Sequence, residues 1–202
     1  MAAERPESRR LRSDAELNRA RIIAAAREVF RDRGIAATLN DVARHAGVGV
    51  ATVYRRFADK DELVGALFED IVDTAETVTR AGLAEPDAWV GLTRALEQVC
   101  EVQAMDRGLR EVMLGTGRGS QRREQMRARV GPLLDELVAR AKEQGLLRAD
   151  IVPPDFPTLQ LMLGAVTEHL GQPELWRRYL ALLIDGMRAR PDLTPLPGTG
   201  QR

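Results

Sequence analysis

A stretch of twenty residues, Thr38–Phe57, constrains the fold of this chain more than any other feature. Ala43 and Gly47 lie one helical turn apart, and small residues are needed where the backbones of two short helices meet near a right angle. Val42 and Val48 are spaced to fill the wedge between these helices and a supporting helix before them. A short turn then separates the two helices. The pattern predicts a helix-turn-helix unit, whose second helix lies in the major groove of DNA.

The rest of the chain also favours helices. Ala, Leu, Arg and Glu dominate, aromatic residues make up only 4%, and Val, Ile and Thr form no alternating runs, a mixture typical of α-helices. We therefore expect an all-α fold with about nine helices, placed by apolar periodicity and by Gly and Pro breaks. The predicted helices are Asp14–Arg33, Thr38–Gly47, Gly49–Phe57, Asp59–Arg80, Trp89–Ala104, Arg107–Leu114, Arg122–Gln144, Asp155–Leu170 and Glu174–Arg190, and Gly115–Ser120 is a predicted loop.

Charge is distributed unevenly along the chain. Residues 1–60 carry 13 Lys and Arg against 8 Asp and Glu, a net charge of +5, and the remainder carries −5, so the whole chain is neutral. A basic N-terminal segment followed by an acidic remainder suits a protein with one DNA-facing end, because DNA phosphates attract the basic segment. A chance imbalance on a solvated surface would give the same numbers, so charge supports this interpretation without deciding it.

The sequence has no pattern typical of a disulfide-bonded, membrane-spanning, secreted or enzymatic protein. Cys100 is the only cysteine, which leaves neither an intramolecular disulfide nor a multi-cysteine metal site. No apolar run approaches the roughly 20 residues that span a bilayer, and no apolar stretch follows the arginines of Met1–Arg12 as in a secretory signal. Two histidines, no Walker pattern and no nucleophile–base pair argue against an enzyme. We expect no cofactor, no metal and a soluble cytoplasmic protein.

The run of residues 22–67 carries a resemblance to a known family. The combination that marks it is Thr52-Val-Tyr54, then Phe57, then Lys60-Asp-Glu-Leu63. With the helix-turn-helix pattern before it, this run resembles the DNA-binding domain of the TetR family of bacterial repressors. Arg177–Arg188 is also similar to the last helix of many of these regulators.

Composition and the resemblance together predict four segments. These are a flexible Arg-rich arm at residues 1–13, a three-helix helix-turn-helix DNA-binding domain at 14–60, a C-terminal helical ligand-binding and dimerisation domain at 61–190, and a disordered tail at 191–202, rich in Pro and Gly. Arg9, Arg10 and Arg12 of the arm either enter the minor groove of DNA or stay in solvent.

The candidate phosphate contacts follow from helix physics and from the resemblance. Thr38 and Asp41 form a capping-box pattern, with Asp in place of the usual Glu. Because helix N-termini bind phosphates, we expect Thr38, through its hydroxyl and the amides at the helix start, to contact one. The resemblance implies phosphate contacts for Tyr54 and Lys60, and Arg44 of the preceding helix adds a further candidate.

The candidate base contacts lie on the predicted recognition helix. Thr52 and Arg55 are on its exposed face and reach either backbone or bases. Val50 and Ala51 occupy the end that enters the groove, where many relatives have a polar or basic residue. Apolar side chains contact the thymine methyl but make no bidentate hydrogen bond to guanine, so the base specificity stays open.

Two sets of residues have expected roles in the C-terminal part. The resemblance implies a four-helix dimer interface across a two-fold axis, built from apolar stripes on the last two helices. The interface candidates are Leu159, Met162, Leu163, Val166, Tyr179, Leu180, Leu183, Ile184 and Met187. A Met-rich apolar surface on the middle helices suits a ligand pocket, because it adapts to varied ligands. The pocket candidates are Trp89, Leu96, Cys100, Met105, Met113, Met126, Val130, Phe156 and His169. For each set, packing against the protein's own core is the alternative.

We interpret the chain as a sequence-specific transcriptional regulator. It would bind a palindromic operator in double-stranded DNA as a homodimer and be released by a small-molecule effector of unknown identity. The effector would favour a state in which the helix after Lys60 has swung and the recognition helices no longer match the DNA. Two alternatives stay open: a helical protein-interaction adaptor with a degenerate helix-turn-helix, and a regulator that needs a co-repressor. Salt dependence separates DNA binding from an apolar protein interface, because phosphate contacts weaken steeply with salt.

Overall fold

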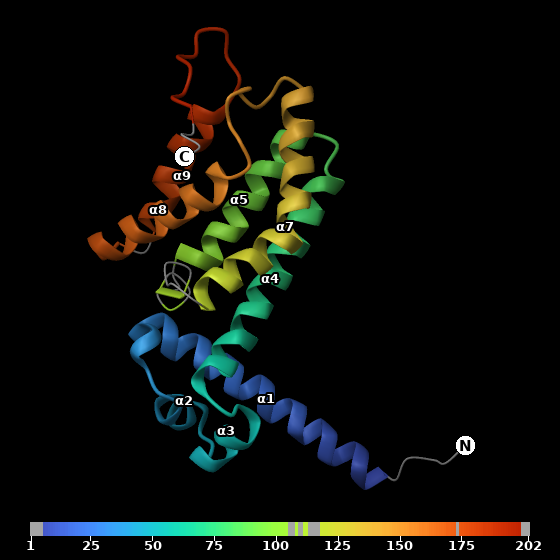
Figure 1. Cartoon of the computed structure of the whole chain (residues 1–202), viewed down its shortest axis with the longest axis vertical. Coiled ribbons are helices and arrows are strands. Elements are labelled where there is room, and N and C mark those ends of the chain that lie inside the picture. The colour runs from blue at the N-terminus through green and yellow to red at the C-terminus, as the bar shows by residue number, and fades with distance from the viewer. Residues whose placement is uncertain (1–5, 105–107, 109–110, 113–117, 173, 199–202) are drawn as a thin grey trace. The chain divides into compact units, whose positions relative to one another are not determined.

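The computed structural model describes residues 6–104, 108, 111–112, 118–172 and 174–198 (Figure 1). Within these ranges the chain forms eight α-helices, a 3-10 turn and one isolated bridge between Leu147 and Arg188. The all-α prediction is confirmed, and most of the weak helix predicted at Arg107–Leu114 lies outside the described residues. The helices are α1 Pro6–Arg33, α2 Leu39–Ala46, α3 Val50–Arg56, α4 Lys60–Ala84, α5 Ala88–Ala104, α7 Arg118–Glu143, α8 Asp155–Leu170 and α9 Leu175–Met187, and the 3-10 turn η1 is Gly34–Ala36.

Helix α1 begins earlier than the sequence predicted. Its first residue is Pro6 rather than Asp14, so most of the expected flexible arm at residues 1–13 is helical. Proline suits the first turn of a helix, where its missing N–H costs nothing, and the arginines that follow favour helices. Apolar periodicity, on which the predicted start of this helix rested, is absent from residues 6–13 of the sequence.

Three other helix ends also differ from the predicted ones. α4 ends at Ala84 and not at Arg80. α7 begins at Arg118, inside the predicted loop Gly115–Ser120. α9 ends at Met187, before the predicted Arg190, because Arg188 takes an extended backbone conformation with φ −68° and ψ 137°. This conformation allows Arg188 to bridge to Leu147. A pairing partner far away in the sequence therefore decides where α9 ends.

The chain divides into two compact units. The first is Met1–Asp70 with Asp106–Glu111, and the second is Ile71–Met105 with Val112–Arg202. The division lies within α4, after Asp70, whereas the sequence placed it between residues 60 and 61. The first turns of α4 contribute the buried residues Leu63 and Leu67, which accounts for their place in the first unit.

The first unit packs α2 and α3 with α1 around a small apolar core. Figure 1 shows α2 and α3 beside α1. Its core residues are Ile22, Ala26, Phe30, Val42, Ala43, Val53 and Phe57, each less than 4% exposed. Gly47 ends α2 with a φ of +65°, in the left-handed region that glycine adopts without a Cβ penalty. The N–H of Val48 donates to the carbonyl of Ala43 at 3.1 Å, so the chain turns at once toward α3.

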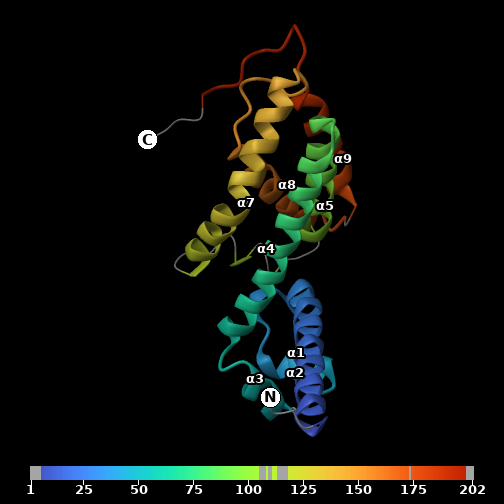
Figure 2. The same ribbon diagram turned by 90° about the vertical axis from the view of Figure 1, so that its right-hand side faces the viewer.

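In the second unit, α5 packs against α7, α8 and α9 (Figure 2). The buried residues of this core are Ala88, Trp89, Leu92, Leu96, Cys100, Leu137, Val138, Ala141, Leu147, Ile151, Phe156, Leu163, Trp176, Leu180 and Met187. Helices α7, α8 and α9 thus each bury one side in the core of this unit.

Helices α4 and α5 approach each other at a pair of glycines. A Cβ on Gly91 would lie 2.1 Å from the carbonyl oxygen of Gly82, and a Cβ on Gly82 would lie 2.8 Å from the carbonyl oxygen of Gly91. Both obstacles are backbone atoms, which cannot rotate away as a flexible side chain does. The contact therefore requires glycine at both positions.

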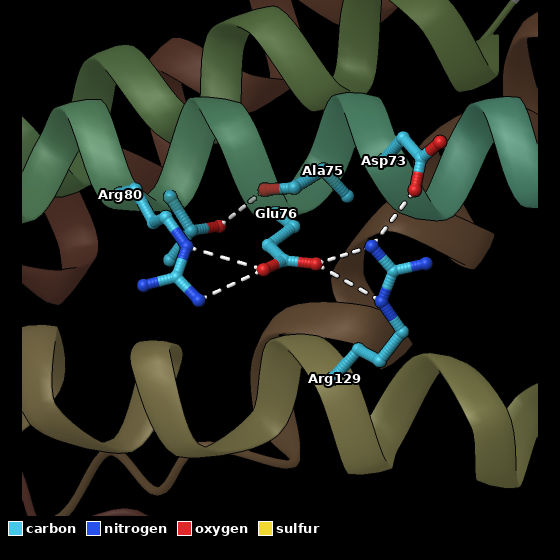
Figure 3. Close-up of polar contacts among 6 residues, drawn as sticks. Asp73, Ala75, Glu76, Arg80 and Arg129 are labelled. Carbon is cyan, nitrogen blue, oxygen red and sulfur yellow. Dashed lines mark hydrogen bonds and ion pairs between the residues drawn. The ribbon is translucent and has the colours of Figure 1, made fainter. Parts of the chain in front are cut away.

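On another side, α4 is joined to α7 by charged groups (Figure 3). Glu76 of α4 accepts hydrogen bonds from Nε of Arg129 of α7 at 2.9 Å and from Arg80 at 2.8 Å, and Asp73 accepts from Arg129 at 2.7 Å. The bonds from Arg80 and then from Arg129 lower the pKa of Glu76, and those from Glu76 and Asp73 raise the pKa of Arg129. One guanidinium thus holds two turns of α4.

The segment after α9 is attached to the second unit. Arg148 donates to Asp150 at 2.6 Å and to the carbonyl of Thr194 at 2.7 Å, and Asp150 accepts from the N–H of Leu196 at 2.8 Å. The bonds from Arg148 and Leu196 hold the pKa of Asp150 well below its usual range. The predicted disordered tail at 191–202 is therefore held at Thr194 and Leu196. Its Pro- and Gly-rich composition could not reveal partners some forty residues away.

Substituting Gly91→Ala should lower the free energy of unfolding by about 1–3 kcal/mol, because the new methyl collides with the α4 backbone. Equilibrium unfolding in urea measures the change. Gly186→Ala in α9 is the matched control, since a Cβ there meets nothing within 4 Å and alanine favours the helix. Equal stability of the two variants would contradict the close contact.

Substituting Glu76→Gln should lower stability at neutral pH and should matter less in acid. The pKa of Glu76 is lowered in the folded state, so its carboxylate stabilises the fold above its unfolded pKa. This contribution is lost as the pH falls below the unfolded value and through the lowered folded pKa. Thermal unfolding of both proteins from pH 7 into the acid range measures it. Glu136→Gln, at an exposed glutamate of α7, should show no such pH dependence. A Glu76→Gln effect that stays constant with pH would exclude a role for the charge.

Candidate nucleic-acid interface and ligand cavity

Thr38 is the N-cap of α2, and the predicted capping box is present. Its Oγ1 accepts from the N–H of Asp41 at 3.2 Å, and Oδ2 of Asp41 accepts from the N–H of Thr38 at 3.0 Å and from its hydroxyl at 2.6 Å. The box leaves the amides of Leu39 and Asn40 without partners inside the helix. These two amides, rather than the Thr38 hydroxyl, are the donors that a phosphate would meet first.

Two arginines flank the start of α2. Arg33 at the end of α1 pairs with Asp41 at 3.1 Å, and Arg44 pairs with the same carboxylate. The pKa of Asp41 is lowered, chiefly by the hydrogen bonds from Thr38 and further by the two arginines. The side chain of Arg44 is 73% exposed, so it keeps donors for a phosphate. Arg33 was not among the predicted residues, although its place in the last turn before the N-cap is visible in the sequence.

Helix α3 presents an apolar and basic surface. Val50 and Tyr54, one turn apart, are 42% and 51% exposed, whereas Val53 between them is fully buried. Ala51 is also exposed. The helix contains no carboxylate and ends in Arg55 and Arg56. It offers aliphatic carbons, a phenol hydroxyl and two guanidiniums to a partner.

Thr52 and Arg55 are coupled on this helix. A guanidinium nitrogen of Arg55 donates to Oγ1 of Thr52 at 3.0 Å. The bond uses one of the five donors of the arginine and directs the side chain along α3 toward its N-terminal end. Thr52 is half-buried and Arg55 is exposed, so of the two, Arg55 has the longer reach toward DNA.

Lys60 has an internal partner that the sequence did not predict. Its Nζ donates to the carbonyl of Ile35 at 2.6 Å, and the N–H of Ile35 donates to the carboxylate of Glu111 at 2.5 Å. Lys60 thus ties the turn before α2 to the start of α4. The ammonium has two further hydrogens, so its expected phosphate contact stays a prediction beside this structural role.

A cavity of about 550 Å³ lies within the second unit. Its volume falls in the range of small-molecule sites. Residues from α4, α5, α7, the segment before α8 and α8 itself form the walls. They are Ala75, Thr79, Leu92, Ala95, Leu96, Val99, Arg123, Glu124, Met126, Arg127, Ala128, Val130, Gly131, Pro132, Leu134, Asp135, Pro153, Pro154, Phe156, Pro157, Gln160 and Leu161. Of the nine pocket candidates, Leu96, Met126, Val130 and Phe156 line this cavity.

Three other pocket candidates do not line it, contrary to our expectation. Trp89 is buried in the core, with the guanidinium carbon of Arg188 5.2 Å from the centre of its ring. Cys100 is 2% exposed, and burial raises the pKa of its thiol to about 12, so the thiol is protonated at neutral pH. His169 is exposed near the end of α8. Apolar spacing identified Trp89 and Cys100 as inward-facing, and His169 as a polar residue on a largely apolar helix. It did not indicate which residues would lie next to them. Met105 and Met113 lie outside the described residues.

The nine dimer candidates separate by burial. Leu163, Leu180 and Met187 are at most 4% exposed and belong to the unit's own core, and Leu159, Leu183 and Ile184 are partly buried against it. Met162, Val166 and Tyr179 are 55%, 40% and 39% exposed. Leu170 and Leu182, which were not predicted, are 50% and 59% exposed on the same two helices. The exposed set, rather than the whole stripe, is available to a partner.

No helix in the described part of the chain is long and apolar enough to cross a membrane. Over the same ranges, no group of three or more His, Cys, Asp or Glu is placed to hold a metal ion.

Two curated transcriptional regulators match part of the chain. The HTH-type transcriptional regulator TtgR of Pseudomonas putida is 40% identical over 80 residues, which is 39% of this chain and 38% of that protein. HbdR of Aromatoleum is 31% identical over 86 residues, 42% of this chain and 35% of that protein. The chain therefore aligns with less than half the length of these curated relatives.

Solved structures match over most of the chain. A TetR regulatory protein from Mycobacterium vanbaalenii is 30% identical, with a TM-score of 0.63, over 89% of this chain and 99% of that one. CprB of Streptomyces coelicolor is 25% identical, with a TM-score of 0.66, over 88% and 92%. FadR of Bacillus halodurans, at 20% identity and a TM-score of 0.67, shares the fold over 86% and 97%.

Two family profiles match the chain itself. Residues 22–67 match the bacterial regulatory proteins of the tetR family, and residues 85–189 match the C-terminal domain of SbtR-like transcriptional regulators. The second match alone covers more than half of the chain. Together with the exposed recognition helix and the helical second unit, these matches show that the chain belongs to the TetR family of DNA-binding transcriptional regulators.

Proposed function

We propose that this regulator is a homodimeric repressor that binds a palindromic operator and is released by a small molecule held in the cavity of its second unit. The observation that carries the proposal is one chain with both an exposed, carboxylate-free recognition helix and a ligand-sized apolar cavity. The helix supplies the DNA contact, and the cavity supplies a place where a signal molecule binds.

The DNA contact divides into positioning and base contacts. The free amides at the start of α2, with Arg33 and Arg44 beside them, suit a phosphate. Tyr54 and Lys60 add donors on the neighbouring helices. Val50 and Ala51 suit thymine methyls in the major groove.

A single helix-turn-helix makes too few contacts to select one site, and dimers overcome this by binding two half-sites. The exposed residues Met162, Val166 and Leu170 recur once per turn on α8, and Tyr179 and Leu182 lie on α9, which packs against α8. An apolar surface of this kind on two adjacent helices favours a second copy of the chain as its partner.

Helix α4 links the proposed ligand to the proposed DNA contact. Ala75 and Thr79 of α4 line the cavity, whereas Lys60 begins the same helix. A ligand that fits the cavity better when α4 has moved would favour that state. The recognition helices of the dimer would then no longer match the spacing of the operator.

Selection from a random DNA duplex pool at moderate salt tests the repressor directly. The purified protein should enrich a palindrome with two related arms, and binding should weaken steeply with salt. The Val50→Glu variant, which adds a carboxylate to the recognition helix, should enrich nothing. If the unmodified protein selects no sequence even at low salt, the apo-repressor mechanism is wrong. A regulator that needs a co-repressor, or a protein-interaction adaptor, would then take its place.

Substituting Leu182→Glu should break the dimer. Its side chain is 59% exposed in one copy, and burying an unpaired carboxylate between two copies should weaken dimerisation by about a hundredfold or more. Sedimentation analysis measures the dimer, and binding to the selected palindrome should weaken with it. Val102→Glu on α5, where the native side chain is 43% exposed, is the control and should stay dimeric. A dimeric Leu182→Glu variant would exclude this surface as the interface.

A further inference from the structure

The charged residues that line the cavity are not distributed evenly on α7. Arg123 and Arg127 lie one turn apart, and Glu124 and Asp135 lie three turns apart. The two carboxylates balance the two guanidiniums in number. The net charge of the lining therefore does not indicate whether the cavity binds an anion or a cation. The position of each charged group on α7 is the remaining evidence.

The two arginines lie on the stripe that buries α7 in the unit. The positions 123, 127, 130, 134, 137 and 141 follow one another at spacings of four and three residues, so they share one face of the helix. Leu137 and Ala141 on this stripe are fully buried in the core. Pro132 lies beside the stripe, and Val130 before it and Leu134 after it still line the same cavity. Arg123 is half-buried and Arg127 is exposed, so the two guanidiniums lie where this stripe of α7 reaches the solvent-facing edge of the cavity.

The two carboxylates lie on a different stripe. Glu124, Ala128, Gly131 and Asp135 also follow one another at spacings of four and three residues. Glu124, Ala128 and Asp135 are all exposed. The carboxylates therefore border the cavity from a neighbouring stripe of α7, and not from the one that carries the two arginines.

The guanidinium of Arg127 has no hydrogen bond or ion pair among the residues that the structure describes. The stem of its side chain runs along the helix, with Cγ 3.6 Å from where a Cβ on Gly131 would lie. Gly131, also on the cavity wall, leaves room for this stem. Arg123 is positioned by a bond to Oγ of Ser120 at 2.9 Å. The guanidinium of Arg123 is thus held in place, and that of Arg127 has its donors available to a ligand.

The remaining walls suit an apolar body. Leu92, Leu96 and Phe156 are at most 5% exposed and face the cavity from α5 and α8. The buried hydroxyl of Thr79 already donates to the carbonyl of Ala75 at 2.7 Å, so it calls for no polar partner. The half-buried amide of Gln160 is a further polar group on the wall.

We propose that the cavity binds an amphipathic organic anion. The apolar body lies against Leu92, Leu96, Val130, Leu134 and Phe156, and the anionic head accepts hydrogen bonds from Arg123 and Arg127. Guanidinium–carboxylate pairs are bidentate and charge-assisted, which favours a carboxylate over a neutral polar group. The inference rests on the proposed function only in treating this cavity as the effector site.

Three probes with one apolar body and different heads test the charge preference: decanoate, decanol and decylamine, each below its micelle concentration. Calorimetry with the full chain, without DNA, measures their binding. Decanoate should bind about tenfold or more tightly than decanol, because a charge-assisted hydrogen bond contributes at least that factor. Decylamine should bind more weakly than either. Equal binding of acid and alcohol, or tighter binding of the amine, would overturn the proposal.

Variants of α7 assign the effect to the two arginines. Arg123→Gln with Arg127→Gln should weaken decanoate binding about tenfold or more and leave decanol binding unchanged, which also shows that the cavity is intact. Arg122→Gln is the control, because this arginine of the same helix does not line the cavity. Unchanged decanoate binding in the double variant would overturn the proposal. Operator binding by the ligand-free protein is measured separately, so a failure here is distinct from a failure of the repressor proposal.

Discussion

The contact between the backbones of α4 and α5 at Gly82 and Gly91 limits how closely and in which register these two helices of the second unit can pack. A Cβ at Gly91 would lie 2.1 Å from the carbonyl oxygen of Gly82, so the two helices meet without side chains between them. Because close-packed backbones leave little room for sliding, we expect α4 either to keep this register against α5 or to leave it. Because Ala75 and Thr79 of the same helix line the cavity, the proposed effector would act directly on this helix. Packed interiors respond to a ligand in this stepwise manner rather than by continuous deformation.

The helix-turn-helix could be predicted because its determinants are local. Thr38 and Asp41 are three residues apart and form the capping box. Gly47 ends α2 in the left-handed conformation, which glycine adopts without a Cβ penalty. Of the two residues predicted to fill the wedge between the helices, Val42 is fully buried and Val48 is half-buried. Each of these features depends on neighbours within a few residues along the chain. A single sequence contains that information completely.

The cavity could be predicted only in part because its walls come from distant segments. Leu96 and Cys100 lie one turn apart on α5, yet Leu96 lines the cavity and Cys100 is sealed in the core. Periodicity identifies the inward face of a helix but does not say where neighbouring helices diverge. The same limit applies to Lys60, whose partner Ile35 is 25 residues away. It applies also to the tail, which Arg148 holds at Thr194.

The apolar N-terminal end of the recognition helix makes the proposed dimer more important than it would be for a regulator with many polar base contacts. Val50 and Ala51 give little discrimination between bases beyond the thymine methyl, and phosphate contacts give affinity without sequence information. Selectivity must then come from two half-sites bound together at a fixed spacing. Affinity that depends on spacing is sensitive to small changes in the geometry of a dimer. In the proposed mechanism, a modest movement of α4 would therefore suffice to release the protein, because Val50 and Ala51 would add little to hold one recognition helix on the DNA by itself.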